Sequence, residues 1–228
     1  MLRSAAKAKR FPIDPSDPLL AALLQSCPVI LAINWVFQGM RGMQGKELGF
    51  RLGLLGVIAA LVASLATAVG IGPVAGLLIG VVLGHSFNFT ANGQLWVVAR
   101  YCALWHRQPD AVDRFLAETI ALLRALPWLD EAVLIGSIAV RGKVSGPRAD
   151  LDLRLVFPPG AAAWWWTNML LLRLRLKALV RFVPLDLYAY DEVGALRRFD
   201  QREPLGIILD RRGAIARDFA ARTRVTLP

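Results

Sequence analysis

Charged residues are absent from one long segment of the chain. The 48 residues of Leu52–Ala99 contain no Asp, Glu, Lys or Arg. One helical crossing of a membrane needs about 20 apolar residues, so this segment is long enough for two crossings and a tight turn. Gly70–Pro73 (Gly-Ile-Gly-Pro) supplies the turn, because glycine and proline together interrupt a helix. The pattern predicts a transmembrane hairpin with helices at residues 52–69 and 73–89.

Small residues recur at every fourth position in both predicted helices. They form two stripes, Gly72, Gly76, Gly80 and Gly84 in the second helix and Gly56, Ala60, Ser64 and Ala68 in the first. Such stripes let helix backbones approach closely in lipid, and they also allow subunits to pair. In a water-soluble helix each glycine would cost roughly 1 kcal/mol relative to alanine. The stripes therefore favour a membrane hairpin over a helical hairpin buried in a soluble core.

The residues that flank the hairpin predict its orientation. Basic residues lie on both sides of it and none lies in the turn: Arg41, Lys46, Arg51, Arg100 and Arg107. Since basic residues concentrate in cytoplasmic loops, both ends are expected on the cytoplasmic side of the inner (plasma) membrane. Residues 1–18 lack the apolar core of a cleaved signal peptide. Residues 19–37 are apolar but contain Pro28, and we interpret them as an interfacial helix rather than a third, shorter insertion.

Two groups of polar or reactive side chains accompany the hairpin. His85, Asn88 and Asn92 are spaced three and four residues apart, so they share one face of the second helix. They either bind a lipid head group or a substrate at the interface, or hydrogen-bond inside the hairpin and cap its helix. Cys27 and Cys102 are interpreted as core or interface thiols rather than nucleophiles, and two cysteines cannot supply a four-ligand zinc site.

The pattern changes near residue 109, which divides the chain into three expected regions. Residues 1–51 are a basic N-terminus with the interfacial helix, residues 52–108 are the hairpin with a juxtamembrane segment, and residues 109–228 alternate helices with strands. The elements expected in the last region are a helix at 109–126, strands at 132–135 and 150–156, a helix at 161–181, a strand at 183–190, a short helix at 193–199, a strand at 205–209 and a basic helical tail at 211–224.

Three aspartates fall on two of these strands. Asp150 and Asp152 are separated by one residue, so both side chains leave the same face of their strand, and Asp186 lies on the next strand. Carboxylates in this pattern suit a pair of Mg²⁺ ions, which bind a few carboxylates together with substrate phosphates and water. Metal ions about 3.5–4 Å apart clamp the attacking and leaving oxygens of a phosphoryl or nucleotidyl transfer. The alternative is that the three aspartates are solvated charges at strand ends.

The residues around these aspartates resemble the signature of the DNA polymerase beta superfamily of nucleotidyltransferases. That signature is an apolar residue, Gly, then Gly or Ser, a spacer, and Asp-x-Asp or Asp-x-Glu. The chain has Leu134–Ser137 (Leu-Ile-Gly-Ser), a spacer of 12 residues and Asp150–Asp152. Pro184–Tyr188 (Pro-Leu-Asp-Leu-Tyr) matches the place where such proteins carry the third carboxylate. The run at residues 203–210 is similar to the closing strand of the minimal nucleotidyltransferase branch.

The resemblance covers about residues 110–212 and implies an α+β fold, a nucleotidyltransferase-like mixed sheet with flanking helices, here preceded by the two-helix transmembrane hairpin. It also implies that Asp150 and Asp152 bind two Mg²⁺ ions, which Mn²⁺ can replace. Asp186 would complete the metal site and help to activate the acceptor hydroxyl. The family usually has Ser or Thr where this chain has Ala149, a change that touches no metal ligand.

The same resemblance implies a nucleotide-binding role for the turn after the first strand. Gly136 and Ser137 would hold the triphosphate of an NTP through backbone N–H and hydroxyl groups. Arg141 and Lys143 are expected to contact phosphates, an inference from their charge and position.

Composition restricts the partners. The formal net charge is +10, and 56% of the residues are apolar while 19% are charged; an average globular chain has about 45–50% and about 25%. The leading hypothesis is a membrane-anchored nucleotidyltransferase that moves NMP from an NTP to an acceptor hydroxyl or phosphate, with a lipid- or glycan-linked acceptor. The alternative is a non-catalytic membrane protein that uses the domain as a nucleotide- or partner-binding regulatory module. A nucleic-acid end-modifying enzyme is disfavoured, because much of the basic charge flanks membrane segments.

The predicted helix at residues 161–181 adds a second indication of a membrane. Trp164–Trp166 lie near its start, and basic residues alternate with leucines in its second half: Arg173, Arg175, Lys177 and Arg181. Either the tryptophans sit at the head-group level of a bilayer, or they pack on the sheet while the basic residues are solvated.

Overall fold

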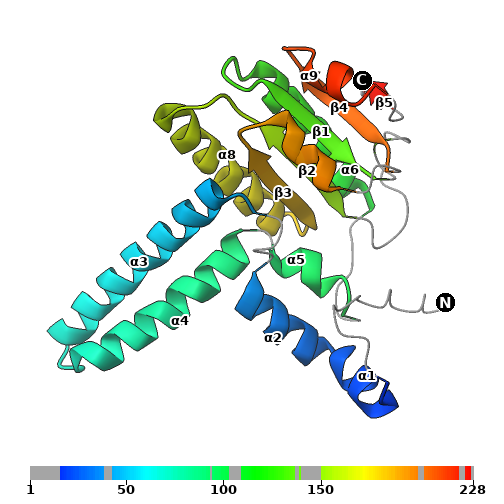
Figure 1. Ribbon diagram of the computed structural model, residues 1–228. Helices are drawn as coiled ribbons and strands as arrows, with labels where there is room; N and C mark the ends of the chain where they lie inside the picture. The colour runs from blue at the N-terminus through cyan, green and yellow to red at the C-terminus, as the bar shows by residue number, and fades with distance from the viewer. Residues whose placement is uncertain are drawn as a thin grey trace.

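The computed structural model describes residues 16–38, 43–92, 94–102, 109–136, 139, 150–199, 203–220 and 224–226. These residues form a mixed sheet with helices on both faces and a long helical hairpin that projects away from it (Figure 1). The helices are α1 (Pro18–Leu24), α2 (Cys27–Phe37), α3 (Gly45–Ala68), α4 (Pro73–Ala91), α5 (Gln94–Ala99), α6 (Pro109–Ala125), α8 (Ala161–Val180) and α9 (Ala214–Asp218). The strands are β1 (Glu131–Ile135), β2 (Leu151–Val156), β3 (Leu185–Tyr190), β4 (Leu205–Asp210) and β5 (Arg224–Thr226), and η2 (Val193–Arg198) is a 3₁₀ helix. The α+β class expected from the sequence is confirmed.

The hairpin consists of α3 and α4, which are both long and apolar enough to cross a membrane. Its turn lies at the predicted place, but α3 begins at Gly45 rather than at residue 52. The early start has a physical reason, since Glu47 and Arg51 in the first turns are buried against the rest of the protein. Helices α1 and α2 meet at 64° and together pass the same test as one bent span, so both interpretations of residues 19–37 stand.

Close packing of the hairpin depends on the glycines of α4. Gly76, Gly80 and Gly84 are buried, and a Cβ added at Gly80 would lie 2.6 Å from the carbonyl oxygen of Ala59 in α3. The predicted stripe in the second helix is therefore confirmed from Gly76 onward. The predicted stripe in the first helix is wrong as a contact face, because its four residues are exposed: Gly56, Ala60, Ser64 and Ala68. The atoms of α3 nearest to the three glycines belong instead to Leu55, Ile58, Ala59, Ala63 and Ala66.

The sheet of described strands has the order β3-β2-β1-β4-β5. Strand β1 runs antiparallel to both β2 and β4, whereas β2 and β3 are parallel, as are β4 and β5. The four predicted strands are confirmed to within one or two residues. The predicted helical tail is largely wrong, because α9 is the only helix among the described residues of the tail and β5 joins the edge of the sheet. Helix α9 starts where the Asp210 carboxylate accepts hydrogen bonds from the N–H groups of Ile215 and Ala216.

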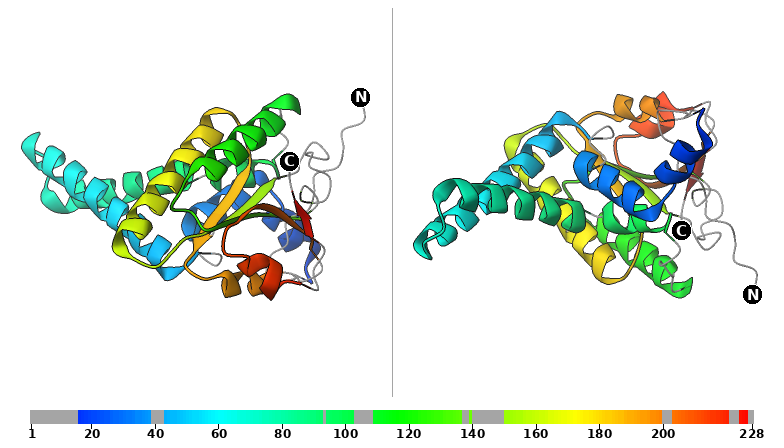
Figure 2. Two further views of the ribbon diagram at one scale, coloured as in Figure 1. Left: turned by 90° about the horizontal axis from the view of Figure 1, so that it is seen from above. Right: turned by 90° about the horizontal axis from the view of Figure 1, so that it is seen from below.

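Two apolar cores lie on opposite faces of the sheet. Figure 2 shows the helices that cover these two faces. In β1, Ala132 and Leu134 face the core made with α6 and α8, while Val133 and Ile135 face the core made with η2 and α9. This alternation follows from the two-residue period of a strand, and it explains why β1 is apolar at every position but its first. The sheet is thus buried on both faces.

A buried ion cluster joins the hairpin to the sheet. The Glu47 carboxylate accepts hydrogen bonds from Arg51 of α3 at 2.7 Å and from Arg175 of α8 at 2.6 Å, and none of these three side chains is more than 4% exposed. Arg175 also donates to the backbone carbonyl of Leu187 in β3 and to Asn92 Oδ1. The first turns of α3 are therefore fixed against the edge of the sheet. We call Glu47, Arg51 and Arg175 the Glu47 cluster.

The polar side chains at the inner end of α4 bond within the protein. Asn88 Nδ2 donates to the Arg51 carbonyl at 2.9 Å, and Asn92 Nδ2 donates to Asn88 Oδ1 at 3.1 Å. His85 Nε2 lies 2.7 Å from the carbonyl oxygen of Trp35. Of the two roles considered for these residues, hydrogen bonding inside the hairpin and its surroundings is the one observed.

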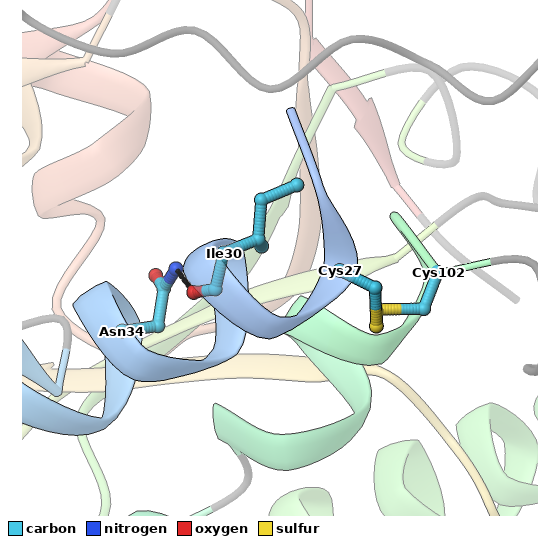
Figure 3. The surroundings of a disulfide bond; sticks show 4 residues. All are labelled: Cys27, Ile30, Asn34 and Cys102. Atoms are coloured by element: carbon cyan, nitrogen blue, oxygen red, sulfur yellow. Dashed lines mark hydrogen bonds between the residues drawn. A yellow bond between two sulfur atoms is a disulfide. The ribbon is translucent and has the colours of Figure 1, made fainter. Parts of the chain in front are cut away.

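A disulfide joins Cys27, at the start of α2, to Cys102, which follows α5 (Figure 3). The interpretation of these cysteines as free thiols is wrong. The pair is 75 residues apart in the sequence, and its Cα atoms approach to 5.2 Å because α2 packs on α5. Ile30, Phe89 and Val98 form the small apolar core of this contact.

Candidate functional site

Three of the residues singled out from the sequence lie side by side in the sheet. In the strand register, Asp152 of β2 is opposite Ile135 of β1 on one side and Asp186 of β3 on the other. Gly136 follows Ile135 with φ of 88°, and a Cβ built on it would lie 4.0 Å from Asp152 Oδ2. Gly136, Asp152 and Asp186 are therefore brought together, on the face of the sheet that carries η2 and α9.

Asp150 precedes β2 and leaves the same face of the strand as Asp152. Its carboxylate forms an ion pair with Arg100, which follows α5. The Arg100 side chain is only 11% exposed, so this pair is largely removed from water. Arg100 stands two residues before Cys102, and the disulfide therefore fixes the backbone from which Arg100 reaches the site.

A second arginine lies between the aspartates. The Arg154 guanidinium is 2.8 Å from Asp186 Oδ2 and 3.7 Å from Asp152 Oδ1, and its side chain is 4% exposed. It also donates to the Asp186 carbonyl at 2.6 Å. The rings of Tyr188 and Phe199 stack on it, with centroids 4.9 and 4.7 Å from the guanidinium carbon. Arg154 is therefore held firmly between the carboxylates and two aromatic rings.

The two carboxylates in register have opposite pKa shifts. Burial, together with the nearby charges of Asp150 and Asp186, raises the pKa of Asp152 well above its ordinary value. Burial, the largest single influence, disfavours the charged form of Asp186, but the charges of Arg154 and Arg100 and the hydrogen bonds with Asp152 and Arg154 together outweigh it and lower the pKa of Asp186. As the pH falls, Asp152 takes up a proton before Asp186 does, so Asp186 is the carboxylate that stays charged.

The phosphate-binding residues predicted from the sequence are only partly testable. Ser137, Arg141 and Lys143 lie outside the described residues. Gly136 is described, and its N–H donates to the carbonyl of Pro204 at 3.3 Å. The backbone N–H that was expected to bind a triphosphate is thus engaged with the segment before β4.

Sequence reasoning missed both arginines of the site. Arg154 carries a readable signal, because it lies two residues after Asp152 and four after Asp150, which places all three on one face of β2. Arg100 carries none, since it is separated from Asp150 by 50 positions and its role depends on how α5 packs.

The donor set of the three aspartates fits Mg²⁺ in its chemistry, because Mg²⁺ takes carboxylate oxygens and keeps several waters. As the side chains lie, Arg100 pairs with Asp150 and Arg154 pairs with Asp186. Among the described residues, no three His, Cys, Asp or Glu side chains converge on one point in the manner of a finished metal site. A cation therefore has to compete with these arginines for the oxygens.

The chain was compared with protein-family models, with curated proteins and with solved structures, and no match was found in any of the three.

Proposed function

We propose that this protein is a membrane-anchored nucleotidyltransferase with a membrane-associated acceptor. The observation that carries the proposal is the register of Asp152 with Asp186, with Gly136 beside them and Asp150 on the same face. The carboxylates come from the adjacent parallel strands β2 and β3, and the glycine turn follows β1. This arrangement suits the transfer of a nucleotidyl group. The resemblance of the motif to the DNA polymerase beta superfamily points to the same activity.

In the proposed reaction, an acceptor oxygen attacks the α-phosphorus of an NTP, and the bond from that phosphorus to the pyrophosphate oxygen breaks. Mg²⁺ held by Asp150, Asp152 and Asp186 would neutralise charge on the phosphates. Arg154 keeps Asp186 ionised, so that a carboxylate oxygen of Asp186 can accept the proton of the attacking hydroxyl. Arg100 would exchange its partner, Asp150, for a phosphate of the nucleotide.

The closeness of the site to the hairpin supports a membrane-associated acceptor. Arg175 binds Glu47 in the first turn of α3 and also the carbonyl of Leu187, the residue after Asp186. The Arg175 side chain thus connects the strand that carries Asp186 directly to α3, a helix that is long and apolar enough to cross a membrane. An acceptor at head-group depth would need to travel only a short distance to reach it.

The proposal is tested by measuring pyrophosphate release from protein in lipid nanodiscs supplied with Mg²⁺, each NTP in turn and a total membrane-lipid extract. Asp186→Asn should lower the rate by at least about a hundredfold, because it removes the proton acceptor. Asp191→Asn is the matched control, since Asp191 follows the other end of β3 and pairs with Lys46. Full activity in Asp186→Asn would contradict the mechanism.

A regulatory, non-catalytic module is the second candidate, and the arginine pairs favour it. Arg100 and Arg154 already neutralise two of the three carboxylates, as expected for a site that no longer binds metal. The two candidates differ in one measurement. An NTP would raise the thermal unfolding midpoint of such a module without any need for Mg²⁺, and the module would release no pyrophosphate with any lipid. An enzyme would require Mg²⁺ and would release pyrophosphate.

The proposed activity uses cytoplasmic NTP, so the sheet with its helices must lie on the cytoplasmic side of the membrane. Two observations point to opposite sides. The basic residues around the hairpin indicate a cytoplasmic domain. The Cys27–Cys102 disulfide is typical of oxidising compartments. Proteolysis of intact spheroplasts and of inverted vesicles distinguishes the two sides. Digestion of the sheet domain in inverted vesicles alone is expected, and digestion in intact spheroplasts would exclude cytoplasmic NTP as its substrate.

A further inference from the structure

Helix α8 is apolar on two separate faces. One face packs on the sheet through Leu171, Leu174 and Ala178, all buried. The other face runs along the helix at spacings of three and four residues, and its side chains are exposed or half-exposed: Trp165, Met169, Leu172, Leu176 and Val180. We call these five residues the outward stripe. An apolar stripe along a helix normally packs against another element, so the outward stripe is expected to have a cover that the described residues do not provide.

The outward stripe begins where the hairpin leaves the sheet domain. Trp164 Nε1 donates to the carbonyl of Lys46 at 3.0 Å, in the first turn of α3. The ring of Phe50, one turn further on, lies 6.0 and 6.1 Å from the rings of Trp164 and Trp165. Figure 1 shows α8 crossing the base of the hairpin. The stripe is therefore continuous with the surface of the helices that are able to cross a membrane.

Exposed apolar residues continue past the end of α8. Val180, the last residue of α8, is 76% exposed. Phe182, which lies beyond the helix, is 50% exposed, and its ring lies 4.8 Å from that of Trp96 in α5. On the other side of the hairpin base, α2 ends with the exposed Val36 and Phe37. The apolar surface thus lies around the base of the hairpin, which is where the surface of a bilayer would meet it.

Aromatic and basic residues of α8 match the chemistry of a membrane interface. Trp165 and Trp166 are 47% and 58% exposed, as suits tryptophan at head-group depth. Trp164, in contrast, is half-buried against the sheet core, so packing on the sheet is observed for Trp164 and the head-group interpretation stays a prediction for Trp165 and Trp166. Arg173, beside the stripe, is exposed, and a basic residue next to anionic lipid strengthens binding to the membrane surface.

We propose that α8 lies in the head-group region of the bilayer spanned by α3 and α4, with the outward stripe against the acyl chains. The sheet and its helices would then contact the membrane along the whole length of α8, rather than being attached to it through the hairpin alone. A second copy of the chain is the competing cover. Continuity with the hairpin, the exposed tryptophans and Arg173 favour lipid. The inference does not depend on the proposed catalytic activity.

The experiment uses the full chain in nanodiscs of phosphatidylethanolamine and phosphatidylglycerol that contain a phospholipid with a diazirine in its acyl chain. After illumination, lipid adducts are mapped by mass spectrometry. Helix α6 is the internal control, because it covers the same face of the sheet but exposes mainly polar side chains. Adducts on α8 should exceed those on α6 by about tenfold, since acyl chains reach only the residues that lie in the interface.

Two outcomes would overturn the proposal. One is adduct formation on α8 at the level of α6 while α3 and α4 are strongly labelled. The other is protection of α8 from lipid together with cross-links between the α8 helices of two chains, which would assign the stripe to a dimer. Leu176→Glu gives a second measurement that needs no assumption about stability. If the stripe faces lipid, the variant should reduce adducts on α8 and leave those on α4 unchanged.

Discussion

Helix α8 is connected to two neighbouring helices by ion triads that share a design and differ in their surroundings. The triads are Glu47 with Arg51 and Arg175, and Glu118 with Lys177 and Arg181. In each triad, one carboxylate forms ion pairs with two basic side chains. The Glu47 side chain is 3% exposed, whereas that of Glu118 is 44% exposed. The same arrangement therefore occurs once at the base of the hairpin and once in contact with water.

The difference decides what each carboxylate does. The Glu47 cluster is buried with one negative and two positive charges, and several of its polar atoms have no hydrogen-bond partner among the described residues: Glu47 Oε2, Arg51 Nε and Nη1, and Arg175 Nε. Because the cluster is buried, the two arginines depend on that single carboxylate for their counter-charge. Around Glu118, water and salt can replace the carboxylate, so its ion pairs contribute little.

The largest effect is expected from Glu47→Gln. Glutamine keeps the shape and one acceptor oxygen but removes the charge, which leaves two buried guanidinium groups without a counter-charge. Breaking a buried ion pair in this way costs about 3–5 kcal/mol. The thermal unfolding midpoint in detergent, followed by tryptophan fluorescence, should fall clearly below that of the parent protein. A shift no larger than that of Glu118→Gln would show that burial does not distinguish the two triads.

The Glu47 cluster also marks the limit of what the sequence allows one to predict. The absence of charge over residues 52–99 was enough to predict the hairpin. Two-residue alternation was enough to predict the strand at 150–156 and the face shared by Asp150 and Asp152, and short apolar runs indicated other strands, such as 132–135. Alternation depends only on neighbouring residues. The start of α3 depends on Arg175, far away in the chain, which pairs with Glu47 and so extends the helix by seven residues beyond the apolar run.

The site shows the same limit. Asp150 and Asp152 were singled out because their spacing is local, whereas Asp186 was assigned from the resemblance of its motif. In the strand register Asp152 lies opposite Asp186. The partners that determine their charge were not predicted. Arg100 reaches Asp150 from α5, whose position depends on the Cys27–Cys102 disulfide, and no periodicity in the sequence reports on either contact.

An intermediate effect on stability is expected from Gly80→Ala. This substitution tests the contrast between buried and exposed positions within the hairpin. A Cβ at Gly80 would lie 2.6 Å from the Ala59 carbonyl oxygen and 2.8 Å from its Cα, so the two helix backbones must separate. Overpacking of this kind typically costs about 1–3 kcal/mol. Gly56→Ala is the matched control, because nothing lies within 4 Å of a Cβ there. The unfolding midpoint should fall for Gly80→Ala and stay the same or rise for Gly56→Ala; equal shifts would contradict the assigned contact face.

The smallest effect is expected from Glu118→Gln, and its dependence on pH identifies its origin. Hydrogen bonds from Arg181 and Lys177 lower the pKa of Glu118 to about 2. The pKa is lower in the folded than in the unfolded protein, where it is about 4.3, so the contribution of Glu118 to stability is present above that value and is lost as the pH falls towards 2. The unfolding midpoints of parent and variant should differ slightly at pH 7 and low salt, and converge on acidification or addition of salt, because exposed pairs are screened. A difference that persists in 1 M salt would contradict this expectation and would mean that Glu118 is shielded from water in the membrane-bound protein. With α8 against the bilayer, such shielding would require that α6 also lay at the interface.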